Sequence, residues 1–184
     1  MAATARSLII GPSTGPETPY PLQMEGKCIP TANLPVDDNL TPAGVYFGWA
    51  SHPNHPETHY GFSIYPMVMS IGNNPYYNNT VRSAEAHLLH DFGADFYGVE
   101  MRLLITGFIR EEKNYAHVEA LIEDINVDCD VARKSLDREA WALRETGTGT
   151  LDGSWLLRET PEQNRLTNTS SPRMTETQTV TRIG

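Results

Sequence analysis

Thr31 and Asn33 have the residue types and the spacing of a small metal site. They lie two positions apart in the segment Pro30-Thr31-Ala32-Asn33, so an extended strand would place a hydroxyl and a carboxamide oxygen on one face. Neutral oxygens suit a hard cation, and Mg²⁺ is usually bound by a few protein atoms together with waters and substrate phosphates. Taken alone, a Thr-x-Asn pair is more often part of a turn or a cap, so this interpretation needs support from other residues.

Glu85 and His87 form a second candidate pair, in the segment 82–92. If this segment is a strand, both side chains lie on one face, and a carboxylate at the rim of an apolar barrel could accept a proton from a substrate hydroxyl. The alternative from this segment alone is a solvated glutamate on a sheet edge.

His52, His55 and His59 have a spacing that could suggest zinc. Pro53 and Pro56 would break the helix needed to bring these imidazoles to one face, and the surrounding residues are those of a polar loop. We therefore expect no metal site here. Two aromatic turns, at residues 73–79 and 95–98, offer rings that could frame a planar ligand, although composition does not identify it.

The elements that must position these residues are mostly strands. Residues 44–51, 66–72 and 101–109 are rich in aromatic, β-branched or large apolar residues and are bounded by Pro, Gly or Asn. The pattern of residues 82–92 fits a helix and a strand equally well. The connections are too short for repeated crossover helices, so we expect antiparallel pairing and a sandwich or small barrel.

One helix is predicted from about Ala116 to Leu136. Its apolar residues recur every three or four positions, as in a helix that packs one face on a sheet. The residues of this stripe are Val118, Leu121, Ile122, Ile125, Cys129, Ala132 and Leu136.

Length and composition limit the class of protein. The 184 residues suit one domain with extra segments, which we divide into an extended N-terminal arm (1–21), the folded domain (22–142) and a threonine-rich, mobile tail (143–184). Within this tail, residues 155–157 could dock locally. A formal net charge of −9 argues against nucleic acid as a partner. No apolar run is long enough for a membrane span and no secretory signal is present, so we expect a cytoplasmic protein. We also expect it to be a monomer.

The order of the motifs is more specific than any one of them. The series MEGK, IPTANLP, AGVYFGWAS, MVMSIGNNPYYNNT, AEAHLLHDFGADFYG and ITGFIREEKNYAHVEALIEDI closely resembles the eukaryotic riboflavin kinase family. The resemblance covers about Met24 to Leu136. It implies a mainly β fold, a six-stranded antiparallel Greek-key barrel with a C-terminal helix packed against it, and it places residues 82–92 on a strand.

The resemblance also implies an activity and site residues. The expected enzyme transfers the γ-phosphate of ATP to the ribityl 5′-hydroxyl of riboflavin, which yields FMN and ADP in FMN biosynthesis. Glu85 matches the family's catalytic base, and Thr31 and Asn33 match the residues that hold Mg²⁺ (or Zn²⁺) and nearby phosphate oxygens. Tyr97 and Gly98 match the flap over the flavin, and the segment around Arg110 helps to frame the same pocket.

One departure from the family is large. The family has a glycine-rich segment that cradles the ATP phosphates between its Gly-Lys and Pro-Thr-Ala-Asn motifs, whereas here Lys27 is followed by only Cys28 and Ile29 before Pro30. Either the segment was lost when the sequence was deduced, or the deletion is real and weakens nucleotide binding. The alternative function is therefore a catalytically impaired barrel that binds riboflavin or FMN.

Overall fold

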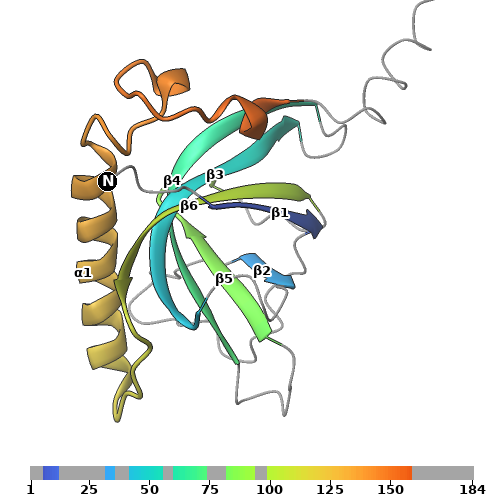
Figure 1. The fold of residues 1–184 in the computed structure, drawn as a ribbon. Coiled ribbons are helices and arrows are strands. Elements are labelled where there is room, and N and C mark those ends of the chain that lie inside the picture. The colour runs from blue at the N-terminus through green and yellow to red at the C-terminus, as the bar shows by residue number, and fades with distance from the viewer. Residues whose placement is uncertain are drawn as a thin grey trace, which may run out of the picture.

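The structure is a computed structural model that describes residues 6–12, 32–35, 42–55, 60–73, 82–93 and 99–158. Within these ranges the chain is mainly β, with one α-helix and two short 3-10 helices (Figure 1). The elements are β1 Arg6–Pro12, β2 Ala32–Pro35, β3 Gly44–His55, β4 Tyr60–Asn73, β5 Arg82–Leu88, β6 Glu100–Arg110, α1 Val118–Leu136, η2 Arg144–Thr146 and η3 Ser154–Leu157. The strands predicted at 44–51, 66–72 and 101–109 lie within β3, β4 and β6, and the ambiguous segment forms the strand β5.

The strands form one sheet in the order β1-β6-β3-β4-β5-β2. Every neighbouring pair is antiparallel. The predicted mainly β, antiparallel fold with one C-terminal helix is therefore confirmed. Closure of the sheet into a Greek-key barrel between its edge strands β1 and β2 stays a prediction.

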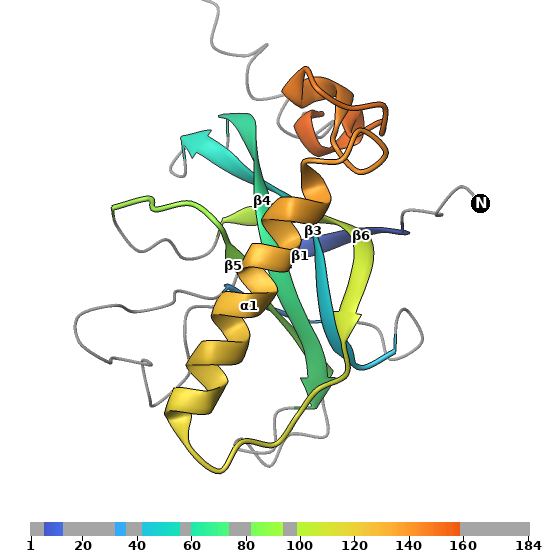
Figure 2. The ribbon, with the colours of Figure 1, turned by 90° about the vertical axis from the view of Figure 1, so that its left-hand side faces the viewer.

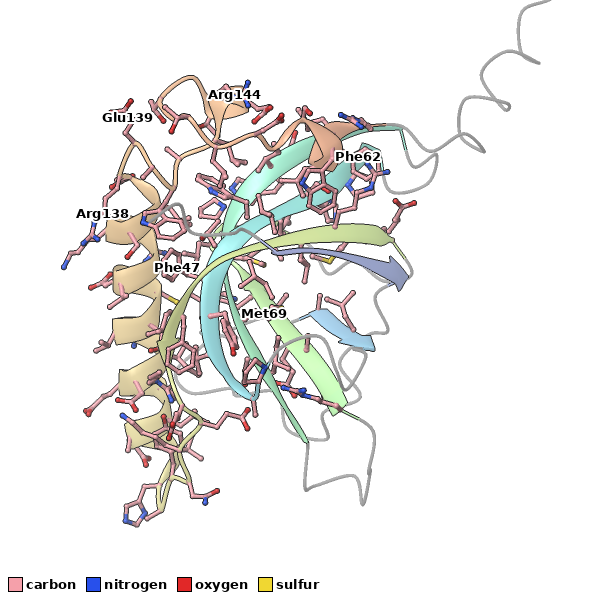
Figure 3. The ribbon with its side chains drawn as sticks, in the orientation of Figure 1. Phe47, Phe62, Met69, Arg138, Glu139 and Arg144 are labelled. Carbon is pink, nitrogen blue, oxygen red and sulfur yellow. The ribbon has the colours of Figure 1, made fainter. Side chains whose placement is uncertain are left out.

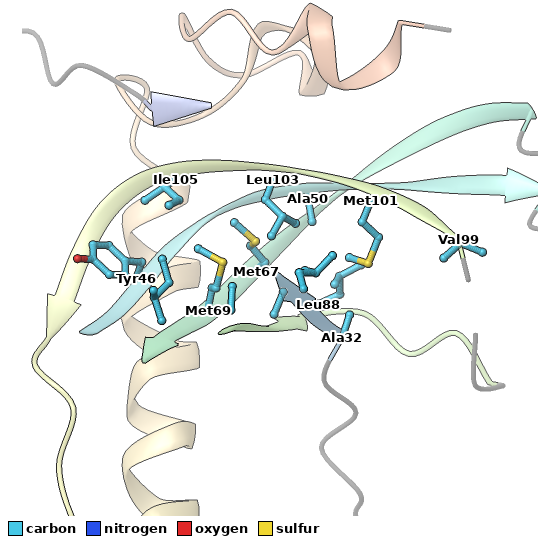
Figure 4. Packing of buried hydrophobic residues seen from close by; sticks show 14 residues of the cluster. Ala32, Tyr46, Ala50, Met67, Met69, Leu88, Val99, Met101, Leu103 and Ile105 are labelled. Carbon is cyan, nitrogen blue, oxygen red and sulfur yellow. The ribbon is translucent and has the colours of Figure 1, made fainter. Parts of the chain in front are cut away.

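The curved sheet buries apolar side chains on both faces, which explains why its strands read as nearly continuous apolar runs. On the concave face, Tyr46 and Ala50 from β3 meet Met67 and Met69 from β4 and Leu103 from β6 (Figure 4). Neighbouring positions point the other way because side chains alternate along a strand. Val45, Phe47, Trp49, Val68 and Leu104 belong to a second cluster on the convex face.

The helix α1 covers this convex face (Figure 2). Its contacts are made by the predicted stripe, of which Cys129, Ala132 and Leu136 are buried. The first turn differs from the prediction, because Val118 remains 45% exposed. The helix therefore packs with its C-terminal two thirds.

Residues 143–158 correct the predicted boundary at 142/143. They were expected to begin a mobile tail, but Leu143 and Leu156 are completely buried in the convex cluster. The buried guanidinium of Arg102 donates hydrogen bonds to the carbonyl oxygens of Trp155, Leu156 and Arg158, and so attaches η3 to β6. The expectation that residues 155–157 could dock is met, and this segment covers one end of the sheet (Figure 3).

The N-terminal arm also needs a correction. Residues 6–12 were included in an extended arm, but they form β1, whose residues pair with 100–105 of β6. Backbone hydrogen bonds to an exposed strand edge explain this placement, because the unpaired N–H and C=O groups of β6 would otherwise face solvent.

Candidate active site

Asn33 and Glu85 are brought together by the pairing of β2 with β5. They are register partners in this antiparallel pair, and Glu85 is in turn directly opposite Ser70 on β4. Directly opposite positions of antiparallel strands lie on the same face of a sheet. The three positions therefore form a row of polar residues across three strands.

The face on which this row lies follows from its neighbours. Ala84 and Ala86, on either side of Glu85, are completely buried in the concave cluster. Glu85 and His87 alternate with them and are half-buried, so they lie on the opposite, convex face. Glu85 thus lies on the strand next to the edge strand β2, with β4 on its other side.

Glu112, in the connection from β6 to α1, approaches the same row. The Ser70 hydroxyl donates a hydrogen bond to Oε1 of Glu112 at 2.8 Å. Sequence reasoning missed both residues. Ser70 could have been noticed as a hydroxyl in the otherwise apolar run Met67-Val68-Met69-Ser70-Ile71, but nothing local indicates that Glu112 would meet it.

Arg110 is held by α1. Its Nε lies 3.0 Å from Oδ1 of Asp128, and its Nη2 lies 2.7 Å from Oδ2. Burial alone would lower the pKa of the Arg110 guanidinium, but the hydrogen bonds and charge of Asp128 outweigh it and raise that pKa. The sequence indicated a pocket-forming role for Arg110 and missed its partner Asp128.

A second set of contacts fixes the segment that follows Arg110. Lys113 Nζ and Tyr115 Oη each lie 2.7 Å from Oδ2 of Asp124 on α1. These two donors lower the pKa of the Asp124 carboxyl. Burial and the hydrogen bond to Asp124 raise the pKa of Tyr115 to about 12.

A cluster of four rings lies toward the end of β3 and the start of β4, away from Ser70. His52 and Phe92 have ring centroids 4.7 Å apart, Tyr65 and His90 4.6 Å, and Tyr65 and Phe92 5.0 Å. Burial lowers the pKa of the His52 imidazole, a backbone hydrogen bond with Pro53 opposes this, and the charge of His90 lowers it further. His52, one of the three histidines with zinc-like spacing, thus packs among aromatic rings.

Three predicted site residues, Thr31, Tyr97 and Gly98, lie outside the described residues, as does the Gly26-Lys27 junction. Across the ranges that are described, no group of three or more His, Cys, Asp or Glu side chains could hold a metal ion.

The model of the riboflavin kinase (flavokinase) family matches residues 25–136, the stretch that contains β2 to α1. This chain belongs to the riboflavin kinase family. It is 54% identical to the riboflavin kinase of Pyricularia oryzae, over 85% of this chain and 96% of that protein. Its identity to the riboflavin kinase of Neurospora crassa is 45%, over 83% and 97% of the two chains.

A solved structure agrees with the family fold. The crystal structure of riboflavin kinase from Trypanosoma brucei superposes with a TM-score of 0.56 at 23% identity, and covers 80% of this chain and 92% of that one. At this identity the likeness concerns the fold alone.

This family member is shorter than its relatives in at least one segment. The alignments with the Pyricularia and Neurospora proteins extend over 193 and 229 positions, more than the 184 residues of this chain. Both relatives therefore contain residues that have no counterpart here. No helix of the described ranges is long and apolar enough to cross a membrane.

Proposed function

We propose that this chain is a riboflavin kinase, which transfers the γ-phosphoryl group of ATP to the ribityl 5′-hydroxyl of riboflavin and releases FMN and ADP. The observation that carries the proposal is the family match over residues 25–136, together with the register that places Asn33 opposite Glu85. The family match favours the active enzyme over an impaired flavin-binding barrel.

Glu85 is the proposed general base. Its position on the convex face is opposite Asn33 of β2 and Ser70 of β4, and its backbone is fixed by pairing on both sides. In the reaction, Glu85 accepts the proton of the ribityl hydroxyl as the oxygen bonds to the γ-phosphorus and the bond to the ADP oxygen breaks. Phosphoryl transfer depends mostly on positioning and charge stabilisation, so one well-placed carboxylate is sufficient as the base.

Thr31 and Asn33 are the proposed holders of a divalent cation. A hydroxyl and a carboxamide oxygen fit Mg²⁺, with Zn²⁺ as the other family option, and Asn33 lies at the register position opposite the base. When bound, the cation neutralises phosphate charge, which matters in a protein whose own net charge is −9. Tyr97, Gly98 and Arg110 are the proposed flavin contacts.

The remaining features of the proposal concern the whole molecule. We infer that the sheet closes into a Greek-key barrel, because its edge strands β1 and β2 approach each other. We also infer that the enzyme acts as a cytoplasmic monomer on riboflavin and ATP, without nucleic acid or membrane partners. The acidic net charge supports the exclusion of nucleic acid.

Conversion of riboflavin to FMN by the purified 184-residue protein, with ATP and Mg²⁺, tests the proposal by chromatography. A second protein carries a family-type glycine-rich segment inserted after Lys27. We expect FMN from the chain itself and faster conversion by the second protein, because backbone N–H groups of such a segment bind phosphates. FMN from neither protein would overturn the proposed function.

A further inference from the structure

Glu112 extends over the strand next to the proposed base. Its carboxylate accepts the 2.8 Å hydrogen bond from Ser70, and it also lies against Gly72, where an added Cβ would collide with both carboxylate oxygens. Ser70 and Gly72 are two positions apart and share one face of β4. A hydroxyl and a missing side chain thus together accommodate the Glu112 carboxylate on this face.

The segment that carries Glu112 is attached to α1 on both sides. Arg110 precedes it and binds Asp128, while Lys113 and Tyr115 follow it and bind Asp124. This double attachment limits how far the backbone of Glu112 can move. The backbone around Glu112 is therefore fixed in the position that allows the contact with Ser70, although Glu112 is itself exposed.

Ser70 connects Glu112 to Glu85. Directly opposite residues of an antiparallel pair have Cβ atoms about 4.5–5.5 Å apart, so the side chains of Ser70 and Glu85 start close together on one face of the sheet. A serine hydroxyl has one proton to donate. While that proton is donated to Glu112, it is not donated to Glu85, so the Ser70 hydroxyl does not occupy a carboxylate oxygen of the base.

We propose that Glu112 is a positioning residue that holds the Ser70 proton away from Glu85, so that Ser70 does not compete with the substrate hydroxyl for the base. This inference rests on the proposed function, in which Glu85 accepts the proton of the ribityl hydroxyl. Glu112 itself touches neither substrate nor the reacting atoms in this arrangement. Glu112 acts on Glu85 only through the Ser70 hydroxyl.

Four variants test the inference by steady-state kinetics with riboflavin, ATP and Mg²⁺. Glu112→Ala should lower kcat about three- to tenfold and leave both KM values within about twofold, because the released Ser70 hydroxyl can then compete with the substrate hydroxyl for Glu85. Glu112→Gln should keep a kcat near that of the parent, since its amide oxygen still accepts from Ser70. Ser70→Ala should also stay near the parent, and combined with Glu112→Ala it should restore kcat.

The restored double variant distinguishes this role from a merely structural one, because a lost packing contact is not recovered by a second truncation. Glu111→Ala, a neighbouring exposed glutamate, is the matched control and should leave kcat unchanged. An unchanged kcat in Glu112→Ala, or a double variant as slow as Glu112→Ala, would overturn the inference. If the parent forms FMN and Glu85→Gln does not, the proposed function stands whatever the Glu112 variants show; if neither the parent nor the protein with the inserted glycine-rich segment forms FMN, both fail.

Discussion

Asn33 on β2 and Glu85 on β5 are direct register partners, although 52 positions separate them in the chain. The pairing places a carboxamide position beside a carboxylate on the convex face of the sheet. In the proposed reaction, this pairing would bring the cation-binding position next to the base that accepts the proton of the nucleophile.

Glu85→Gln should lower kcat for FMN formation by about 10²- to 10⁴-fold, because the amide cannot accept the proton of the ribityl hydroxyl. Riboflavin binding, followed by quenching of flavin fluorescence, should change little since the side chain keeps its size. Glu119→Gln, an exposed glutamate on α1, is the control and should retain full turnover. A Glu85→Gln protein with parental kcat would remove Glu85 from the role of base.

Asn33→Ala should raise the Mg²⁺ concentration needed for half-maximal activity by about tenfold, because one neutral oxygen ligand is lost. Titration of Mg²⁺ at saturating riboflavin and ATP measures this shift. Asn114→Ala, at an exposed position before α1, should leave the titration unchanged. Removal of divalent cations by EDTA should abolish FMN formation and re-addition should restore it; full activity in EDTA would contradict the metal assignment.

Asp128→Asn should destabilise the protein by about 3 kcal/mol, because it leaves the Arg110 guanidinium without its charged partner. The Asp128 side chain is only 3% exposed in this ion pair. The nearby pair of Arg133 and Asp130 provides the control: the Asp130 side chain is 67% exposed, and Asp130→Asn should cost about 0.5 kcal/mol or less. Urea unfolding measures both values, and equal effects of the two substitutions would contradict the assigned importance of Arg110 and Asp128.

The free energy of unfolding should fall as the pH is lowered from about 7, because of His52. Its pKa is lowered in the folded protein, so the folded state binds fewer protons than the unfolded state below the ordinary histidine pKa of about 6.5. The stabilisation is complete above that pH and is lost toward the lower, folded-state pKa. One such group contributes a slope of at most about 1.4 kcal/mol per pH unit.

The dependence can be measured by urea unfolding between pH 5 and 8. His52→Phe should flatten it, since an apolar ring suits the cluster with Phe92 and carries no proton. His117→Gln, at the exposed start of α1, should leave it unchanged. The same pH dependence in the parent and in His52→Phe would show that other groups are responsible.

The sequence alone located several of the local elements and, through the order of its motifs, the family. Apolar runs bounded by breakers located β3, β4 and β6, and a stripe with a period near 3.6 located α1, because these patterns depend on residues close in the chain. The residue types of Thr31, Asn33 and Glu85, with the order of the motifs, indicated the family that the comparisons show.

Other features depend on partners that lie far away in the chain. The burial of Asp128 depends on Arg110, the docking of η3 depends on Arg102, and the contact of Glu112 depends on Ser70. No local pattern marks such pairs, since each requires a particular strand register or helix orientation that only the packed sheet provides. Local patterns were therefore enough for β3, β4, β6 and α1, and the order of the motifs was enough for the family. Tertiary structure decided which face Glu85 occupies and which charges are paired, because long-range packing sets both.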